Sequence, residues 1–164
     1  DFGDPAEGRS SLSTLQSPIA RPAGLAADLT VGNGCTYATI AAAIAAANPG
    51  DTLLVEGERT FVENIAIPIT LTVQGGYDGC ASGSSARTTL DGNASGSVVI
   101  VERAIAVSLQ NLNITNGNTG LEGGGIRFAR GDGTGALNLS NVMIYGNTAM
   151  GRRAVGGAGC ARER

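Results

Sequence analysis

Apolar residues downstream of position 51 recur at every second position, in short runs separated by glycine, asparagine, aspartate and serine. Such alternation is typical of β-strands that bury one face. The pattern predicts strands at residues 52–55, 65–67, 69–73, 97–101, 107–109, 112–114, 126–128, 137–139 and 142–145. Because the runs are short and numerous, they indicate an all-β repeat architecture.

One segment upstream of these runs follows a different period. Four residues recur there at helical spacing within an alanine-rich stretch: Tyr37, Ile40, Ile44 and Ala47. They predict a single amphipathic helix, which Thr36 or Thr39 can cap. The following Asn48-Pro49-Gly50 ends it, since proline disfavours helix at the residue before it and glycine permits a turn.

An internal repeat links two of the strand-rich segments. AVSLQNLNITNGN (residues 106–118) aligns with ALNLSNVMIYGNT (residues 136–148) at an offset of 30. Inside each copy the apolar spacing runs two, three, two, and the extra step falls beside Asn111 and Asn141. Asparagine tolerates left-handed backbone angles, so each marks a corner between two strands. Three short strands and an asparagine corner per repeat predict about four coils of a parallel β-helix, stacked about 4.8 Å apart.

The predicted helix has a role in this architecture. The first coil of a stack exposes unpaired backbone and an apolar cross-section, which an amphipathic helix can cover. Ile40 and Ile44 are therefore expected to be buried against the first coil. The resulting organisation is a flexible lead-in segment at 1–28, a cap of strand and helix at 29–50, the parallel β-helix at 51–150 and an irregular tail at 151–164, consistent with a truncated chain.

Composition narrows the function classes. All eleven basic residues are arginine, histidine is absent and the net charge is −3, so no basic footprint for nucleic acid is present. The absence of histidine removes the commonest metal ligand and proton shuttle. No apolar run approaches the roughly 18 residues that a membrane span needs.

Several motifs carry a family resemblance. GGGI (residues 123–126), GGAG (156–159) and IYGN (144–147) are similar to repeats of polymorphic outer-membrane proteins. Residues 33–150 as a whole resemble secreted bacterial right-handed parallel β-helix proteins of the pectate-lyase-like superfamily. The resemblance implies a right-handed coil and a secreted or cell-surface, outer-membrane-associated location. The chain departs from the pattern at Gly159, where an aliphatic residue would begin another strand.

The resemblance also implies a disulfide. Related sequences commonly carry cysteines near the positions of Cys35 and Cys80, and a bridge between them would tie the cap to an early coil. Cys160 makes the cysteine count odd, so two other pairings, or free thiols, stay open.

Two candidate functional sites can be extracted from the sequence. Enzymes of the resembled superfamily use acidic calcium ligands with an arginine base, or paired carboxylates. The scattered candidates here are Asp78, Asp91, Glu102, Arg103 and Arg127, of which Asp91, Arg103 and Arg127 are the catalytic candidates, and no two acids share a short motif. Arg130-Gly131-Asp132 is an RGD tripeptide of the kind that can bridge an integrin pocket and its metal ion. The favoured interpretation is solvated turn and surface charge for the first set and a coincidental glycine-rich turn for the RGD tripeptide.

These observations favour a non-catalytic adhesin, passenger or stalk module that contacts an extracellular polysaccharide or a host or cell-surface ligand. No cofactor or resident metal is expected. The alternatives are a polyuronate lyase or glycoside hydrolase, for which Ca²⁺ would be relevant, and a self-assembling filament subunit. The filament alternative follows from the uncapped C-terminal end, which predicts end-to-end self-association.

Overall fold

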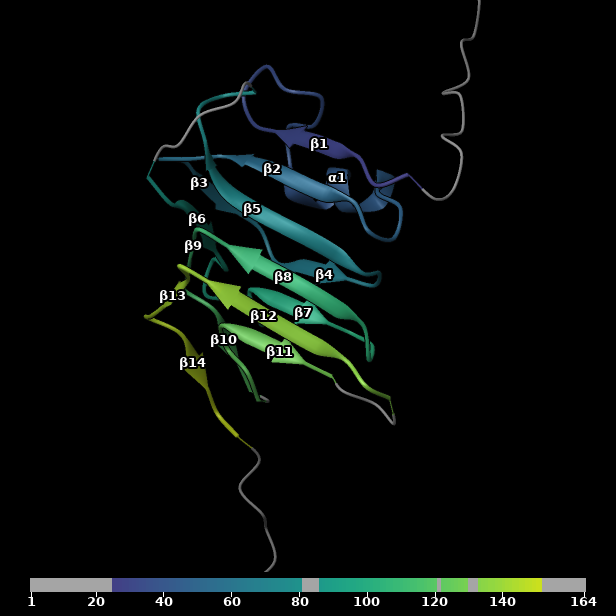
Figure 1. Cartoon of the computed structure of the whole chain (residues 1–164). Coiled ribbons are helices and arrows are strands. Elements are labelled where there is room, and N and C mark those ends of the chain that lie inside the picture. The colour runs from purple at the N-terminus through teal and green to yellow at the C-terminus, as the bar shows by residue number, and fades with distance from the viewer. Residues whose placement is uncertain (1–24, 81–85, 121, 130–132, 152–164) are drawn as a thin grey trace, which may run out of the picture.

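The computed structural model describes residues 25–80, 86–120, 122–129 and 133–151. These residues form short strands and one helix, in agreement with the all-β prediction (Figure 1). The helix is α1 (Ile40–Ala46). The strands are β1 (Asp28–Val31), β2 (Thr52–Glu56), β3 (Thr60–Val62), β4 (Ile65–Ile67), β5 (Leu71–Tyr77), β6 (Thr88–Asp91), β7 (Val99–Val101), β8 (Ala106–Gln110), β9 (Leu112–Thr115), β10 (Asn118–Thr119), β11 (Ile126–Phe128), β12 (Ala136–Ser140), β13 (Met143–Ile144) and β14 (Thr148–Ala149).

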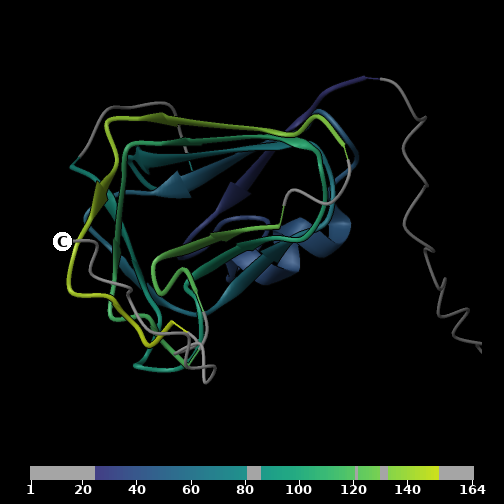
Figure 2. The same ribbon diagram turned by 90° about the horizontal axis from the view of Figure 1, so that it is seen from below.

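The strands pair in parallel and form separate sheets. Their orders are β1-β2-β5-β8-β12, β3-β6-β9-β13, β4-β7-β11 and the short pair β10-β14. The chain passes through β2, β3 and β4 in three different sheets, and β5 then returns beside β2. We call each such pass a circuit. Figure 2 shows successive circuits lying over one another around a common interior.

The circuits differ in length but keep a common register. Leu53 pairs with Val73, Val73 with Leu109, and Leu109 with Leu139, so the steps along the chain are 20, 36 and 30 residues. The last step is the offset that the sequence repeat displays. The longer circuits place their extra residues in the connections between strands, which leaves the strand ladder intact.

Inward-facing aliphatic side chains form a continuous core. In β2, Leu53 and Val55 are fully buried while their neighbours are partly exposed, and the same alternation continues in β5, β8 and β9. Each buried aliphatic side chain stabilises the fold by about 1.5–3 kcal/mol through removal of apolar surface from water. Thr88 is a polar member of this interior, and its hydroxyl donates to the Glu56 carbonyl (2.8 Å) and accepts from the Gly76 N–H (3.0 Å).

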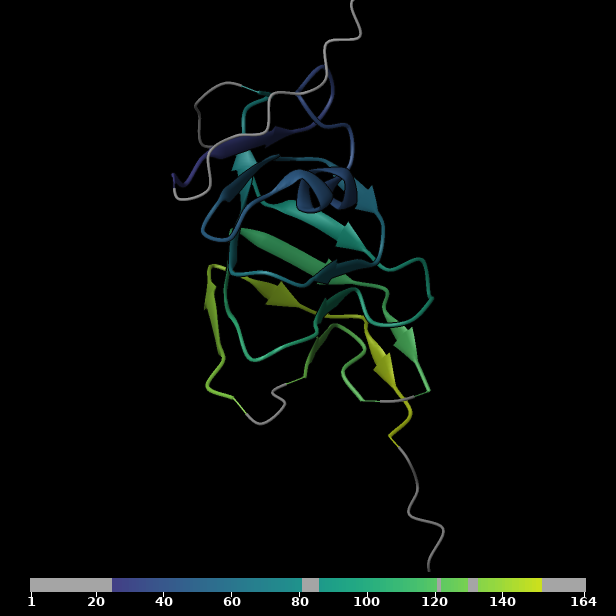
Figure 3. The same ribbon diagram turned by 90° about the vertical axis from the view of Figure 1, so that its right-hand side faces the viewer.

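The helix α1 lies at the N-terminal end of the stack and contacts β1, β2 and β4 (Figure 3). Ile40 is fully buried and Ile44 is 8 % exposed, and both join the core. Of the two predicted caps the structure uses Thr39, whose side-chain oxygen accepts from the Ala42 N–H (3.2 Å). The Glu63 carboxylate, from the first circuit, accepts from the first two helical N–H groups at 2.9 and 3.0 Å.

A disulfide fastens this end. Cys35 lies in the loop between β1 and α1, and Cys80 follows β5, with 5.2 Å between their Cα atoms. Of the pairings left open by the sequence, this is the one that the structure contains. The bridge joins the helix-bearing end to the second circuit.

Several strands escaped the sequence pattern. β3 and β6 each bury a single large apolar side chain, Phe61 and Leu90, so neither produces an alternating run. The pair β10-β14 consists of two-residue strands that the pattern also missed. Gly159, where the sequence predicts that a strand is lost, lies outside the described residues.

Candidate functional site

The outward face of the largest sheet is lined by hydroxyl and amide groups. Strand register places Leu54, Gln74, Gln110 and Ser140 side by side in one row across β2, β5, β8 and β12. A second row on the same four strands contains Thr52, Thr72, Ser108 and Asn138. Because strand residues alternate between faces, burial of the aliphatic positions leaves these polar ones directed outward.

The predicted asparagine corner borders this face. Asn111 and Asn141 have φ angles of 56° and 53°, in the left-handed region that asparagine tolerates. The side chain of Asn141 donates to that of Asn111 (2.5 Å), and Asn111 donates to the Gly75 carbonyl (3.1 Å). Arg87 completes the series: its guanidinium donates to the carboxamide oxygen of Asn141 and, at 3.0 Å, to its backbone carbonyl. The corner is thus a directional chain of hydrogen bonds.

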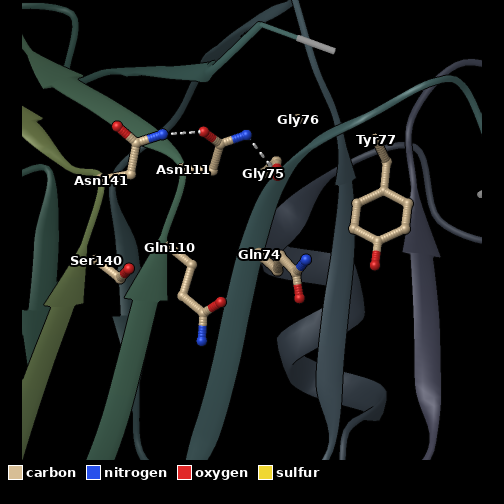
Figure 4. Close-up of a pocket in the computed structure, with 8 residues that line it drawn as sticks. All are labelled: Gln74, Gly75, Gly76, Tyr77, Gln110, Asn111, Ser140 and Asn141. Carbon is tan, nitrogen blue, oxygen red and sulfur yellow. Dashed lines mark hydrogen bonds between the residues drawn. The ribbon is translucent and has the colours of Figure 1, made fainter. Parts of the chain in front are cut away.

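A hollow of about 260 Å³ lies where the polar rows meet this corner (Figure 4). Its lining consists of Gln74, Gly75, Gly76, Tyr77, Gln110, Asn111, Ser140 and Asn141. Figure 4 shows the side chains of Gln74, Gln110 and Ser140 projecting to the same side of the sheet, with the Tyr77 ring next to Gln74.

Two local features shape the hollow. The pairing of β2 with β5 shifts register between Leu54 and Glu56, so that Glu56 is opposite Tyr77. Such a bulge re-aims the following side chains. Gly75 lies where the next circuit is very close: a Cβ there would fall 2.6 Å from the Asn111 carbonyl oxygen. Gly76, which directly precedes Tyr77, has a φ of 83°, and the Tyr77 ring lines the hollow.

The hollow is suited to a neutral, hydroxyl-rich ligand. Carboxamides and hydroxyls both donate and accept hydrogen bonds, which matches the bonding capacity of sugar hydroxyls. A tyrosine ring adds a flat apolar surface with one polar tip. All eight lining residues are uncharged, and none of them supplies a carboxylate that would hold a cation. The charged group in contact with this lining is the Arg87 guanidinium, which donates to Asn141.

Glu56, which lies opposite Tyr77 in the strand ladder, is already engaged. Its carboxylate accepts from the Asn33 N–H and from the Arg59 guanidinium, each at 2.8 Å. These two hydrogen bonds, the Asn33 one first, lower the pKa of the Glu56 carboxyl below its usual value. Arg59 in turn lies over the Phe61 ring, 5.0 Å from its centroid. Glu56 therefore secures a loop to the first circuit.

The structure does not bring the sequence-derived catalytic candidates together. Asp91 ends β6, and its carboxylate accepts from the Asn93 N–H (2.7 Å) and the Asn116 amide (2.8 Å). Arg127 is in β11, in another sheet, and its buried Nε has no hydrogen-bond partner. Arg103 lies in the connection between β7 and β8. Asp91 thus stabilises a turn, and the three side chains form no common site.

Three further features considered in the sequence analysis are a metal site, the RGD tripeptide and a membrane span. Within the described ranges, no three His, Cys, Asp or Glu side chains gather closely enough to hold a metal ion. Arg130, Gly131 and Asp132 lie outside the described residues. No helix in the described part of the chain has the length and apolar character needed to cross a bilayer.

Sequence reasoning found two of the lining residues, Asn111 and Asn141, as a corner, but it did not identify the hollow or the other residues that line it. The offset of 30 would have paired Gln110 with Ser140, but Gln74 is 36 residues before Gln110 and therefore lies outside the visible repeat. Arg87 gave no signal at all, since its partner Asn141 is 54 residues away.

Comparison with known proteins adds no relative: no family model, curated protein or solved structure matches the chain.

Proposed function

We propose that the chain is a right-handed parallel β-helix module, secreted or displayed at the outer membrane, that binds an extracellular polysaccharide and does not cleave it. The parallel sheets visited in turn by each circuit support the fold. The Cys35–Cys80 bridge suits an oxidising compartment. The module would act as an adhesin, passenger or stalk.

The observation that carries the binding proposal is the uncharged hollow of about 260 Å³ on the outer face of β5, β8 and β12. Its amide and hydroxyl groups lie in rows at the strand spacing of about 4.8 Å. A glycan chain laid along the face would therefore meet an amide or hydroxyl group on each of β5, β8 and β12. Individual contacts of this kind contribute about 1 kcal/mol, so affinity would accumulate over several sugar units.

The lining also favours a class of glycan. A polyuronate carries one carboxylate per sugar and would need arginine or a bound cation in the hollow. Because the eight lining residues are uncharged and the Arg87 guanidinium is already bonded to Asn141, we propose a neutral polysaccharide as the ligand. Separation of Asp91 from Arg127 in different sheets supports the absence of lyase or hydrolase chemistry.

Titration calorimetry with neutral and uronate oligosaccharides of equal length tests the proposal. Neutral oligomers should bind, and Tyr77→Ala and Gln110→Ala should each weaken binding at least tenfold. Val62→Ala, which shortens an outward side chain on β3, is the control and should bind like the parent. Equal loss in Val62→Ala, or absence of binding to every neutral oligomer, would contradict the proposal.

An activity assay on pectin and alginate, with and without Ca²⁺, addresses the enzyme alternative. No product release is expected. Turnover that disappears in Asp91→Ala or Arg127→Ala would overturn the non-catalytic reading and return both residues to a catalytic role.

A further inference from the structure

Arg87 lies outside the lining of the hollow but is anchored beside it. Its backbone adjoins Thr88, which is fully buried and whose N–H donates to the Asn111 carbonyl (3.2 Å). The Thr88 hydroxyl accepts from the Gly76 N–H (3.0 Å). Because Gly76 and Asn111 both line the hollow, the base of the Arg87 side chain is held at a fixed place next to it.

The head of the Arg87 side chain reaches from the start of β6, past the circuit of β9, to the circuit that contains β13. Its guanidinium donates to the backbone carbonyl of Asn141 (3.0 Å), to the carboxamide oxygen of the same residue and to the Met143 Sδ (3.3 Å). Asn141 is exposed, and Arg87 is 54 residues away from it along the chain. Three contacts from one guanidinium therefore hold this exposed corner in place.

The two ends of the hydrogen-bond chain at the corner allow only one direction. A guanidinium only donates and a backbone carbonyl only accepts. With Arg87 at one end and the Gly75 carbonyl at the other, each carboxamide between them accepts through Oδ1 and donates through Nδ2. Figure 4 shows the Asn141 and Asn111 carboxamides lying end to end toward Gly75. Their orientation is thus set by the partners at the two ends.

A fixed direction gives the corner a defined chemistry. Each carboxamide nitrogen carries two N–H groups and uses one in the chain, so Asn111 and Asn141 each keep one further N–H. The charged donor at the head of the chain polarises the amides and strengthens their N–H groups as donors. Because both residues line the hollow, the corner favours a ligand atom that accepts, such as a hydroxyl or ring oxygen of a sugar.

The rest of the polar lining has no such restraint. The side chains of Gln74, Gln110 and Ser140 form no hydrogen bond with the described part of the chain, so each can turn either to donate or to accept. One side of the hollow is therefore adaptable and the other is fixed. The fixed side is the part that can set the orientation of a bound sugar.

We infer that Arg87 is a positioning residue for the glycan site proposed above, on which this role rests. It holds Asn141, and through Asn141 the carboxamide of Asn111, so that their remaining N–H groups donate to oxygen atoms of the ligand. Arg87 acts without touching the ligand. The role requires a side chain that is long, charged and able only to donate, because a shorter neutral group cannot make the three contacts at once.

Titration calorimetry of the full chain with a neutral oligosaccharide tests this role. Arg87→Gln should weaken binding about tenfold, as expected when a charge-assisted contact is lost. Arg87→Lys keeps a charged donor without the planar fork, so its affinity should fall between those of Arg87→Gln and the parent. Arg103→Gln makes the same change before the start of β8, whereas Gln110 is at the end of that strand, and should bind like the parent. Equal weakening in Arg103→Gln, or parental affinity in Arg87→Gln, would overturn the inference.

Nuclear magnetic resonance of the free protein supplies a second readout that needs no ligand. In the parent, the side-chain NH₂ signals of Asn111 and Asn141 should be shifted away from those of a solvated asparagine. In Arg87→Gln the Asn141 signals should move to the solvated position while the backbone signals of β5 and β8 stay in place, which a general loss of structure would not allow. Unchanged Asn141 signals in Arg87→Gln would contradict the positioning role. A parent that binds no neutral oligosaccharide would instead overturn the proposed function, and the amide signals would still decide whether Arg87 holds the corner.

Discussion

The two ends of the stack are built on the same aliphatic core but finish it differently. Ile44, on the helix at one end, is 8 % exposed, whereas Ile144, on the last circuit at the other, is 48 % exposed. Both side chains lie against a core of similar composition. The comparison shows that stacked aliphatic side chains do not bury the apolar surface at either end of the stack. That surface is removed from water only where another element, such as α1, packs over it.

Polar contacts sharpen the contrast. At the N-terminal end the Glu63 carboxylate binds two helical N–H groups, and the Cys35–Cys80 bridge adds a covalent tie. At the C-terminal end the corresponding support is the Arg87 guanidinium on the Asn141 corner. We therefore expect the loss of N-terminal contacts to destabilise the fold more than the loss of C-terminal contacts.

The largest difference between the ends is expected for paired aspartate substitutions. Ile44→Asp places an unpaired charge against the core and should lower the free energy of unfolding by about 3–5 kcal/mol. Ile144→Asp, at the exposed end, should cost less than about 1 kcal/mol in the monomer. Urea denaturation at low micromolar protein measures both. Equal losses would mean that the open end is covered in solution, and a small loss for Ile44→Asp would mean that α1 is not a cap.

Removal of the disulfide should cause the second-largest loss in the free energy of unfolding. Cys35 and Cys80 are 45 residues apart, and the closure entropy of a loop of that length is worth about 3–4 kcal/mol. The double variant Cys35→Ser/Cys80→Ser, made with Cys160→Ser as the parent, should lose roughly that amount in thermal or urea unfolding. If the parent and the double variant unfold together, the bridge does not constrain the unfolded chain.

Substitution of Glu63 by glutamine should lower the free energy of unfolding moderately. Glu63→Gln keeps an acceptor for the helix N–H groups but removes the charge that favours it at a helix N-terminus, so a loss of about 1 kcal/mol is expected. Arg87→Gln is the counterpart at the other corner and should cost about 0.5 kcal/mol. Chemical denaturation of both variants measures how much each contact contributes to the free energy of unfolding. A larger loss for Arg87→Gln than for Glu63→Gln would contradict the expectation.

The smallest expected effect concerns acid. The folded state lowers the pKa of Glu56, so Glu56 contributes stability above the pKa it has when unfolded. This contribution is lost as the pH falls through the lower pKa of the folded state, beginning below about pH 5. Arg59→Gln removes one of the two hydrogen-bonding partners and should make the decline in stability shallower. Melting temperatures between neutral and acid pH measure this, and an unchanged profile would show that Asn33 alone sets the shift.

The fold could be predicted wherever two inward aliphatic residues mark a strand. β4 and β11 have the predicted bounds, and the corner at Asn111 and Asn141 follows from the spacing of the repeat. β6 was missed because its inward residues are Leu90 and Thr88, and a buried threonine looks polar in any hydrophobicity pattern. Hydrogen bonds from Thr88 to the neighbouring circuit offset its burial, and these exist only after folding.

The candidate site was less predictable than the fold. Its residues become neighbours only through register, and Gln74 and Gln110 are joined across a circuit of 36 residues that has no repeat signature. The acid and arginine residues that seemed chemically promising, Asp91 and Arg127, were chosen by residue type alone. The type of a side chain indicates which chemistry it can support. The number of residues in each circuit determines which side chains become neighbours in the folded protein.

The unequal ends also give the molecule a direction under tension. Each circuit contacts only its neighbours, so a pull on both ends of the stack would be resisted one ladder at a time. β12 and β1 are both end strands of this sheet and share one ladder each, with β8 and β2, but the Cys35–Cys80 bridge lies at the β1 end. Peeling would therefore start at the C-terminal circuit and travel toward the disulfide. The disulfide would prevent extension of the residues between Cys35 and Cys80. The segment that contains α1 would therefore be the last part of the chain to unfold under force.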